Sequence, residues 1–153
     1  MAGITLIKSD WLTPLAAATE VVEVDLGLGI DEAAKILGVS LTVAVGTIFT
    51  APMYALIEAA YSFDPEDIVI TRTDDEIFAY VAVATSDLAA STGAQKQSEA
   101  IFLDFTQMNV ITTRNLAFLV AAVGLTGEGV GRVYYEKFTP TDRELITLIA
   151  QRR

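Results

Sequence analysis

The residues from Ile36 to Ile57, ILGVSLTVAVGTIFTAPMYALI, form a run of 22 positions without a charged side chain. A run of that length can cross a bilayer as one helix. Its composition predicts strands instead, because Val, Ile and Thr are restricted in helices and because glycine and proline interrupt the run. Apolar residues also alternate with small or polar ones from Val39 to Gly46. We therefore expect two consecutive buried strands here and no transmembrane helix.

The same two-residue period recurs on both sides of this run. Val21–Ile30 reads VVEVDLGLGI, with apolar residues at every second position. Glu76–Thr85 reads EIFAYVAVAT and is apolar on both faces, which indicates cover on each side. Strands are predicted at Val21–Ile30, Ile36–Phe49, Met53–Phe63, Glu76–Thr85, Ala100–Thr106, Asn109–Thr113, Asn115–Val123 and Val130–Phe138.

Eight predicted strands separated by turn residues indicate an all-β, antiparallel sandwich or barrel. The chain has 153 residues, the size of one ordinary domain. No linker or repeat divides it, so we expect a single domain over residues 20–153. Residues 1–19 contain Trp11 and Pro14 and have no clear strand pattern, so we expect an N-terminal arm there.

Two short helices are predicted. Asp31–Leu37, DEAAKIL, is expected to form a short turn of helix between the first two strands. Near the C-terminus, Thr141 and Glu144 have capping-box spacing. An apolar stripe follows them on a helix of about three turns, at Leu145, Ile146, Leu148 and Ile149.

The glycines at 127, 129 and 131 match neither the dinucleotide-binding pattern nor the P-loop pattern. They predict a hairpin loop between Val123 and Val130. Gly27 and Gly29 similarly predict a bend or bulge in the first strand.

Composition excludes several kinds of site. The chain has no cysteine and no histidine, which removes thiolate and imidazole chemistry, and no nucleophile motif or cofactor motif is present. Twenty acidic residues against ten basic ones give a net charge of −10, so direct nucleic-acid binding is not expected. Lys8 and Asp10 interrupt the start of the chain, which is unlike a signal peptide. We expect a protein that is not an enzyme and holds no cofactor.

Two acidic stretches leave a calcium site as an open alternative. They are Asp64, Glu66 and Asp67, and Asp74, Asp75 and Glu76. Hard oxygen ligands suit Ca²⁺, but the D-x-D-x-D-G pattern of a calcium loop is absent. Clustered carboxylates on loops are usually only solvated, so no metal site is predicted.

Apolar residues on both faces of a strand predict self-association. The sharpest case is Asn115–Val123, NLAFLVAAV, which has no charge. A monomer with such strands would expose large apolar patches unless a partner covered them. Tyr134 and Tyr135 are adjacent, so they point to opposite faces of one strand. The residues predicted to lie at subunit interfaces are Trp11, Phe118, Tyr134, Tyr135, Leu145, Ile146, Leu148 and Ile149.

The strand series, the short helix after the first strand and the closing segment GRVYYEKFTPTDRELITLIAQRR resemble a small viral single jelly-roll capsid protein. The resemblance covers the chain from about Val21 onward. It implies two four-stranded sheets whose copies tile a closed shell, assembled in the host cytoplasm and located in the virion. It also implies partners that are copies of itself and, where present, other virion structural proteins. A basic arm is missing, which puts direct genome contact in doubt.

Two other functions stay open at this point. One is a β-sandwich module that binds a carbohydrate or a receptor on a spike or appendage, which requires an exposed aromatic platform. The other is a membrane-associated protein that uses Ile36–Ile57.

Overall fold

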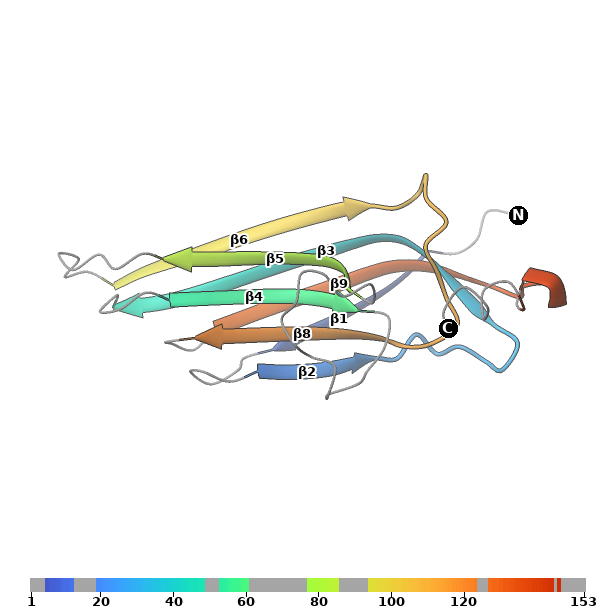
Figure 1. The fold of residues 1–153 in the computed structure, drawn as a ribbon, viewed down its shortest axis with the longest axis horizontal. Helices are drawn as coiled ribbons and strands as arrows, with labels where there is room; N and C mark the ends of the chain where they lie inside the picture. The colour runs from blue at the N-terminus through green and yellow to red at the C-terminus, as the bar shows by residue number, and fades with distance from the viewer. Residues whose placement is uncertain are drawn as a thin grey trace.

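The structure of the protein is a computed structural model. It describes residues 5–12, 19–48, 53–60, 77–85, 94–123, 127–144 and 146. Nine strands form two sheets that overlie one another (Figure 1). The first sheet has the order β1 (Leu6–Leu12), β9 (Gly127–Phe138), β3 (Ala33–Ile48) and β6 (Ala94–Asp104), and β7 (Ile111–Thr112) also pairs with β3. The second sheet has the order β2 (Thr19–Val24), β8 (Leu116–Val123), β4 (Met53–Ala60) and β5 (Ile77–Thr85).

Strand pairing follows the order of a rolled-up hairpin. The first strand pairs with the last, β2 with β8, β3 with β6, and β4 with β5, always antiparallel. The pairings of β3 with β9 and of β4 with β8 then join these pairs into two sheets. This is the connectivity of a jelly roll. The predicted all-β sandwich is confirmed, and the described residues form nine strands where eight were expected.

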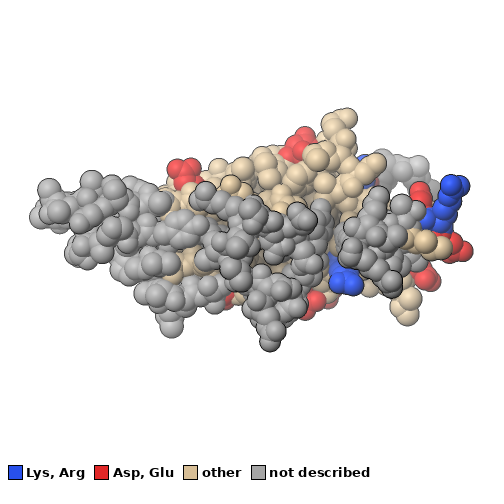
Figure 2. Space-filling view, viewed as in Figure 1, with Lys and Arg blue, Asp and Glu red and all other residues tan. Residues whose placement is uncertain are grey.

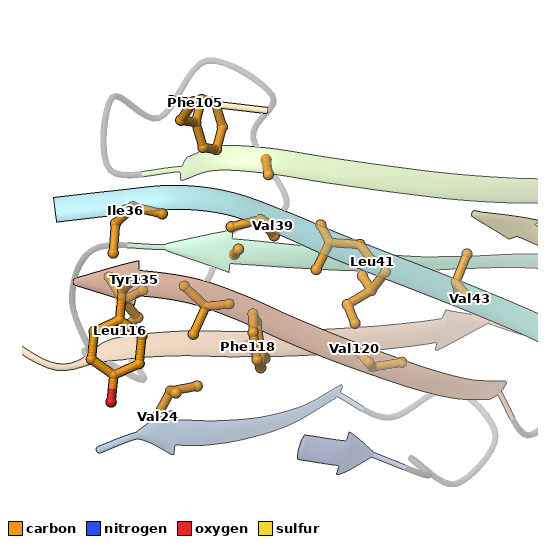
Figure 3. Close-up of a cluster of buried hydrophobic side chains, with 14 of the residues drawn as sticks. Val24, Ile36, Val39, Leu41, Val43, Phe105, Leu116, Phe118, Val120 and Tyr135 are labelled. Atoms are coloured by element: carbon orange, nitrogen blue, oxygen red, sulfur yellow. The ribbon is translucent and has the colours of Figure 1, made fainter. Parts of the chain in front are cut away.

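The core lies between the inner faces of the two sheets. On β8, every second side chain points inward, from Leu116 through Phe118 to Val120, and each is fully buried (Figure 3). From the opposite sheet, Val39 and Leu41 meet them. The alternation in the sequence therefore correctly predicts which residues of these strands point into the core.

The described residues of the uncharged run, 36–48 and 53–57, belong to β3 and β4, as predicted. No helix among the described residues is long and apolar enough to span a bilayer. The predicted helix at Asp31–Leu37 is wrong, because β3 already begins at Ala33. Ala, Lys and Leu favour helix locally, but pairing with β9 and β7 overrides that weak preference.

A β-bulge at Leu37 explains why the pattern changes phase within β3. Ile36 lies opposite Tyr135 and Gly38 lies opposite Tyr134, so Leu37 is an extra residue on this strand. Before the bulge, even-numbered residues such as Ile36 point inward, and after it odd-numbered residues such as Val39 do. The bulge thus keeps both halves of β3 packed on one core.

The N-terminal segment is not an arm throughout. Leu6–Leu12 forms β1 and pairs along its whole length with β9, from Leu6 opposite Tyr135 to Leu12 opposite Gly129. Leu6 also packs against the core. Residues 1–4 and 13–18 of the predicted arm lie outside the described residues.

The predicted hairpin loop between Val123 and Val130 is partly wrong, because Gly127, Gly129 and Gly131 lie within β9 and face the core. A Cβ atom on Gly129 would lie 2.3 Å from Val120 Cγ2, and one on Gly131 would lie 2.6 Å from the Phe118 ring. Both distances are far shorter than a carbon–carbon contact. Gly129 and Gly131 therefore leave the space that Val120 and Phe118 of the opposite sheet occupy. Residues 124–126 of the predicted loop lie outside the described residues.

The first predicted strand, Val21–Ile30, ends earlier than expected. β2 stops at Val24, and residues 25–32 form a connection to β3. Gly27 has φ of 63°, a left-handed conformation that glycine adopts without strain. Lys137 donates a hydrogen bond to the Gly27 carbonyl, and the Gly29 N–H donates to Glu32 at 2.8 Å. These bonds hold the connection against the end of β9.

β8 has both faces buried within the single chain. Leu119 and Ala121 point away from the main core, yet they are 4% and 2% exposed, with Val21 and Ala82 packed beside them. The stretch Asn115–Val123 therefore does not offer its apolar side chains to a partner, contrary to the prediction. Sequence alternation alone does not distinguish cover by the same chain from cover by another one.

The capping box at the start of the C-terminal helix is confirmed. Glu144 N–H donates to Thr141 Oγ1 at 3.4 Å, and the Thr141 N–H donates to Glu144 Oε2 at 2.9 Å. The Thr141 N–H and the Thr141 hydroxyl, which donates to Oε2 at 2.8 Å, lower the pKa of the Glu144 carboxyl below its ordinary value. Only this first turn and Ile146 are described, so Leu145, Leu148 and Ile149 lie outside the described residues.

We predict that Gly129→Ala destabilises the fold by about 1–3 kcal/mol, because the added methyl group overlaps Val120. Gly29→Ala is the matched control and should be nearly neutral, since its nearest neighbour is the flexible side chain of Glu32. Chemical denaturation measures both. Val120→Ala in the Gly129→Ala background should recover stability, and a double variant no more stable than Gly129→Ala alone would contradict the steric explanation.

Candidate subunit interface

Three apolar side chains lie together on the outer face of the first sheet, and we name Ile7, Phe102 and Tyr134 the aromatic patch. Ile7 lies opposite Tyr134 on the neighbouring strand, and Tyr134 lies opposite Gly38 on the next. Phe102 extends from β6 across Gly38, where a Cβ atom would lie 3.1 Å from its Cζ. The patch therefore spans the sheet from β1 to β6.

The missing side chain of Gly38 is what lets the patch form. The rings of Phe102 and Tyr134 meet edge to face with centroids 5.9 Å apart, a favourable aromatic geometry. Ile7 is 57% exposed and Phe102 is 61% exposed. Such large apolar side chains, gathered rather than scattered, are typical of a surface that contacts a partner.

A shallow groove continues from the patch along β3. Its floor consists of small outward side chains at Ser40, Thr42 and Ala44, and larger neighbours stand on both sides. The groove has a volume of about 400 Å³, and its walls include Ser98, Glu128, Val130 and Arg132. In this part of β3 the small side chains point outward and form the groove, while the larger apolar side chains point inward to the core.

Charged residues flank the patch on β9. Arg132 and Glu136 lie two residues to either side of Tyr134, so all three point to the same face of the strand. Arg132 is exposed and Glu136 is half-buried. At the end of this sheet, Lys137 forms an ion pair with Glu32 at 3.9 Å. Neither Arg132 nor Glu136 takes part in that ion pair. Lys35 lies opposite Glu136 on β3.

On the side of the molecule seen in Figure 2, the described basic side chains lie among acidic ones in the right-hand half. The described residues on this side show no extended basic patch.

The predicted interface residues divide into three groups. Tyr134 lies on the outer face, and Ile146 is 67% exposed after the capping box. Phe118 and Tyr135 are not interface residues, because both are buried between the sheets at 0% and 1% exposure. Trp11 occupies a β1 position opposite Val130, and its side chain is outside the described part of the structure.

Sequence reasoning missed Ile7 and Phe102. Ile7 lies in the segment that was predicted to be an arm. Phe102 lies between Ile101 and Leu103, which both pack against the core, so the alternation within β6 places Phe102 outward. An aromatic residue at an outward strand position was the available signal.

A second groove lies where the open edges of the two sheets meet. It has a volume of about 530 Å³ between β5 and β6, and its lining includes Phe78, Val81, Ile101 and Leu103. Phe78 meets Phe105 edge to face with ring centroids 6.1 Å apart. The groove carries no charged side chain in its lining, which is mostly apolar and includes Tyr80.

No metal-binding group of three or more acidic side chains occurs within the part of the chain that the structure describes. The two acidic stretches, residues 64–67 and 74–76, which are the alternative calcium site, lie outside that part. Asp104 has a lowered pKa because it accepts hydrogen bonds from Thr106, which explains the shift by local loop geometry.

Comparison with known proteins gives weak matches. No protein-family model and no curated protein matches the chain. A chain from a structure of desmodium yellow mottle tymovirus is similar at 8% identity over 93% of both chains, with a TM-score of 0.39. A chain of the infectious bursal disease virus VP2 subviral particle matches at 12% identity over 85% of this chain and 41% of that chain, with a TM-score of 0.21. Both are viral structures, and at these values the fold assignment rests on strand pairing instead.

We predict that Tyr135→Phe lowers the free energy of unfolding by about 1–3 kcal/mol without changing self-association. The Tyr135 hydroxyl donates to the buried Leu26 carbonyl at 3.1 Å, and Phe leaves that carbonyl unsatisfied. Denaturation and sedimentation together separate the two effects. A change in association would show that Tyr135 contacts a partner after all.

The stability difference between the wild type and Tyr135→Phe should also depend on pH. Burial, and next the charge of Asp25, raise the pKa of Tyr135 above its ordinary value. The neutral hydroxyl therefore stabilises the fold fully below about pH 10, and this contribution is lost as pH rises through the raised pKa. The stability gap between the wild type and Tyr135→Phe should narrow in alkali, and a gap that widened would contradict this.

Proposed function

We propose that this protein is a structural subunit that associates with copies of itself to build a shell, as a viral capsid protein does. The aromatic patch carries the proposal, because it places exposed Ile7 and Phe102 beside Tyr134 on the outer face of a sandwich. Burial of aromatic side chains is a strong source of affinity between subunits.

The fold supports this use without requiring it. Jelly rolls occur in capsid subunits and also in lectins, so the role has to be argued from the surface. A net charge of −10 opposes nonspecific clustering of copies, while a local apolar contact still permits specific association. The proposed location is the virion, and the proposed partners are further copies and other shell proteins.

The proposed role is structural and not enzymatic. The sequence supports this, because it has neither histidine nor cysteine to serve as base, nucleophile or soft metal ligand. The described acidic side chains whose pKa values shift, Asp104 and Glu144, are each explained by a neighbouring threonine.

The groove along β3 favours a second candidate function. Hydroxyl groups of Ser40 and Thr42, the guanidinium of Arg132 and the nearby exposed ring of Phe102 together match what a saccharide needs, namely polar partners beside an apolar platform. The module would then bind a carbohydrate on this face as a monomer or small oligomer.

Sedimentation velocity and negative-stain microscopy of the full chain test the proposed function. We expect concentration-dependent oligomers or particles, because the patch is buried only by association. Phe102→Ser should raise the dissociation constant at least about tenfold, which corresponds to roughly 1.4 kcal/mol. Met108→Ser is the matched control, since Met108 is 56% exposed and lies in the loop after β6, outside the paired strands.

A chain that stays monomeric at every concentration would overturn the shell proposal. Titration with lactose and with sialyllactose then decides the second candidate. Saturable binding that Arg132→Ala abolishes would identify a saccharide site in the groove.

A further inference from the structure

We propose that two copies pack outer face to outer face through the first sheet, about a twofold axis that runs beside Tyr134. This inference rests on the proposed self-association and names its surface and its partner, a second copy of this chain. In the contact, Arg132 of each copy pairs with Glu136 of the partner subunit.

The order of residues along β9 supports the symmetry. A twofold contact is self-complementary, because residue i meets residue j and residue j meets residue i. Arg132 and Glu136 lie on the same face, each about 7 Å from Tyr134 along the strand but in opposite directions. An axis in the interface plane, perpendicular to β9 at Tyr134, exchanges these two positions. Arg132 of each copy therefore faces Glu136 of the other copy, which gives two ion pairs.

The aromatic patch lies along the same axis. Ile7, Tyr134 and Gly38 occupy one row across three neighbouring strands, and the ring of Phe102 extends over Gly38 into that row. A rotation about the row brings each of these side chains to its own mate. The apolar contact is then central and the charge pairs flank it, which is the usual arrangement of a stable interface.

The area of the face is sufficient. Four paired strands at about 4.8 Å spacing, together with the 12 residues of β9 at about 3.3 Å each, define a face of roughly 20 by 40 Å. That is close to the 800 Å² or so that each partner contributes to an interface of standard size.

One acidic side chain on this row opposes the contact. Asp104 lies opposite Gly38 on the edge strand β6, so it approaches its mate across the axis. Its carboxylate accepts the Thr106 N–H at 2.9 Å and is exposed at the rim, where solvent and salt screen the repulsion. Lys35, opposite Glu136, adds positive charge to the same face.

Charge reversal tests the pairing directly. Arg132→Glu alone places two glutamates together in each pair, and Glu136→Arg alone places two arginines together. Each single variant should raise the dimer dissociation constant at least about tenfold, and the double variant should return it to within about threefold of the wild type. Arg114→Glu and Asp31→Arg are matched controls on exposed residues off the face, and they should leave it unchanged.

A double variant that associates no better than the single ones would overturn the pairing. So would single variants that associate like the wild type while circular dichroism shows them folded. A wild type that associates but ignores these changes disproves the twofold pairing of Arg132 with Glu136 and leaves the proposed self-association standing. A wild type that never associates disproves both.

Cross-linking gives a measurement that does not depend on charge. The chain has no cysteine, so Ile7→Cys introduces a single thiol on the axis. Packed sheets lie about 10 Å apart, too far for a disulfide but suited to a bismaleimide of that length. Ile7→Cys should cross-link to a covalent dimer, whereas Met108→Cys should not. Equal cross-linking of both would overturn the proposed face.

Discussion

The close approach of β8 and β9 is the constraint on which the rest of the structure depends. These strands follow one another in the chain yet lie in opposite sheets, and their inner faces meet where Gly129 accepts Val120 and Gly131 accepts Phe118. Large side chains on one strand fill the space that the other leaves empty, so the two inner faces interlock at these positions. The remaining strands pair outward from these two, β1 and β3 beside β9 and β2 and β4 beside β8.

That constraint also determines what β9 presents to solvent. In the first half of this strand, glycine occupies the three inward positions 127, 129 and 131, so the larger side chains of that half point outward. Arg132 and Tyr134 therefore stand on a central strand with neighbours on both sides, away from the unpaired edges. The bulge at Leu37 brings Gly38, and not a larger residue, beside Tyr134. Inner packing and outer surface thus depend on the same strand registers.

The fold class was readable from sequence because a two-residue period reports burial wherever one face of a strand is covered. The failures have physical causes. The residues of Asp31–Leu37 favour helix locally, and only pairing with distant strands makes them extended. A glycine looks the same in sequence whether it serves a turn or a close approach, so Gly129 was misread. Phe118 was placed at an interface because the sequence does not say which sheet faces it. Ile7 was missed since β1 depends entirely on its pairing with the last strand.

The two sheets differ in how much apolar surface their outer faces expose. On β8, Leu119 and Ala121 are covered within the chain, so the outward side of this strand has no apolar surface left to offer. On the first sheet, Phe102 lies across a glycine where no side chain of its own strand neighbour can cover it. An apolar ring in that position costs free energy in water, about 25 cal/mol for each Å² left exposed. Since the fold itself supplies no cover for it, a second copy of the same face is the simplest partner that carries the complementary row of charges.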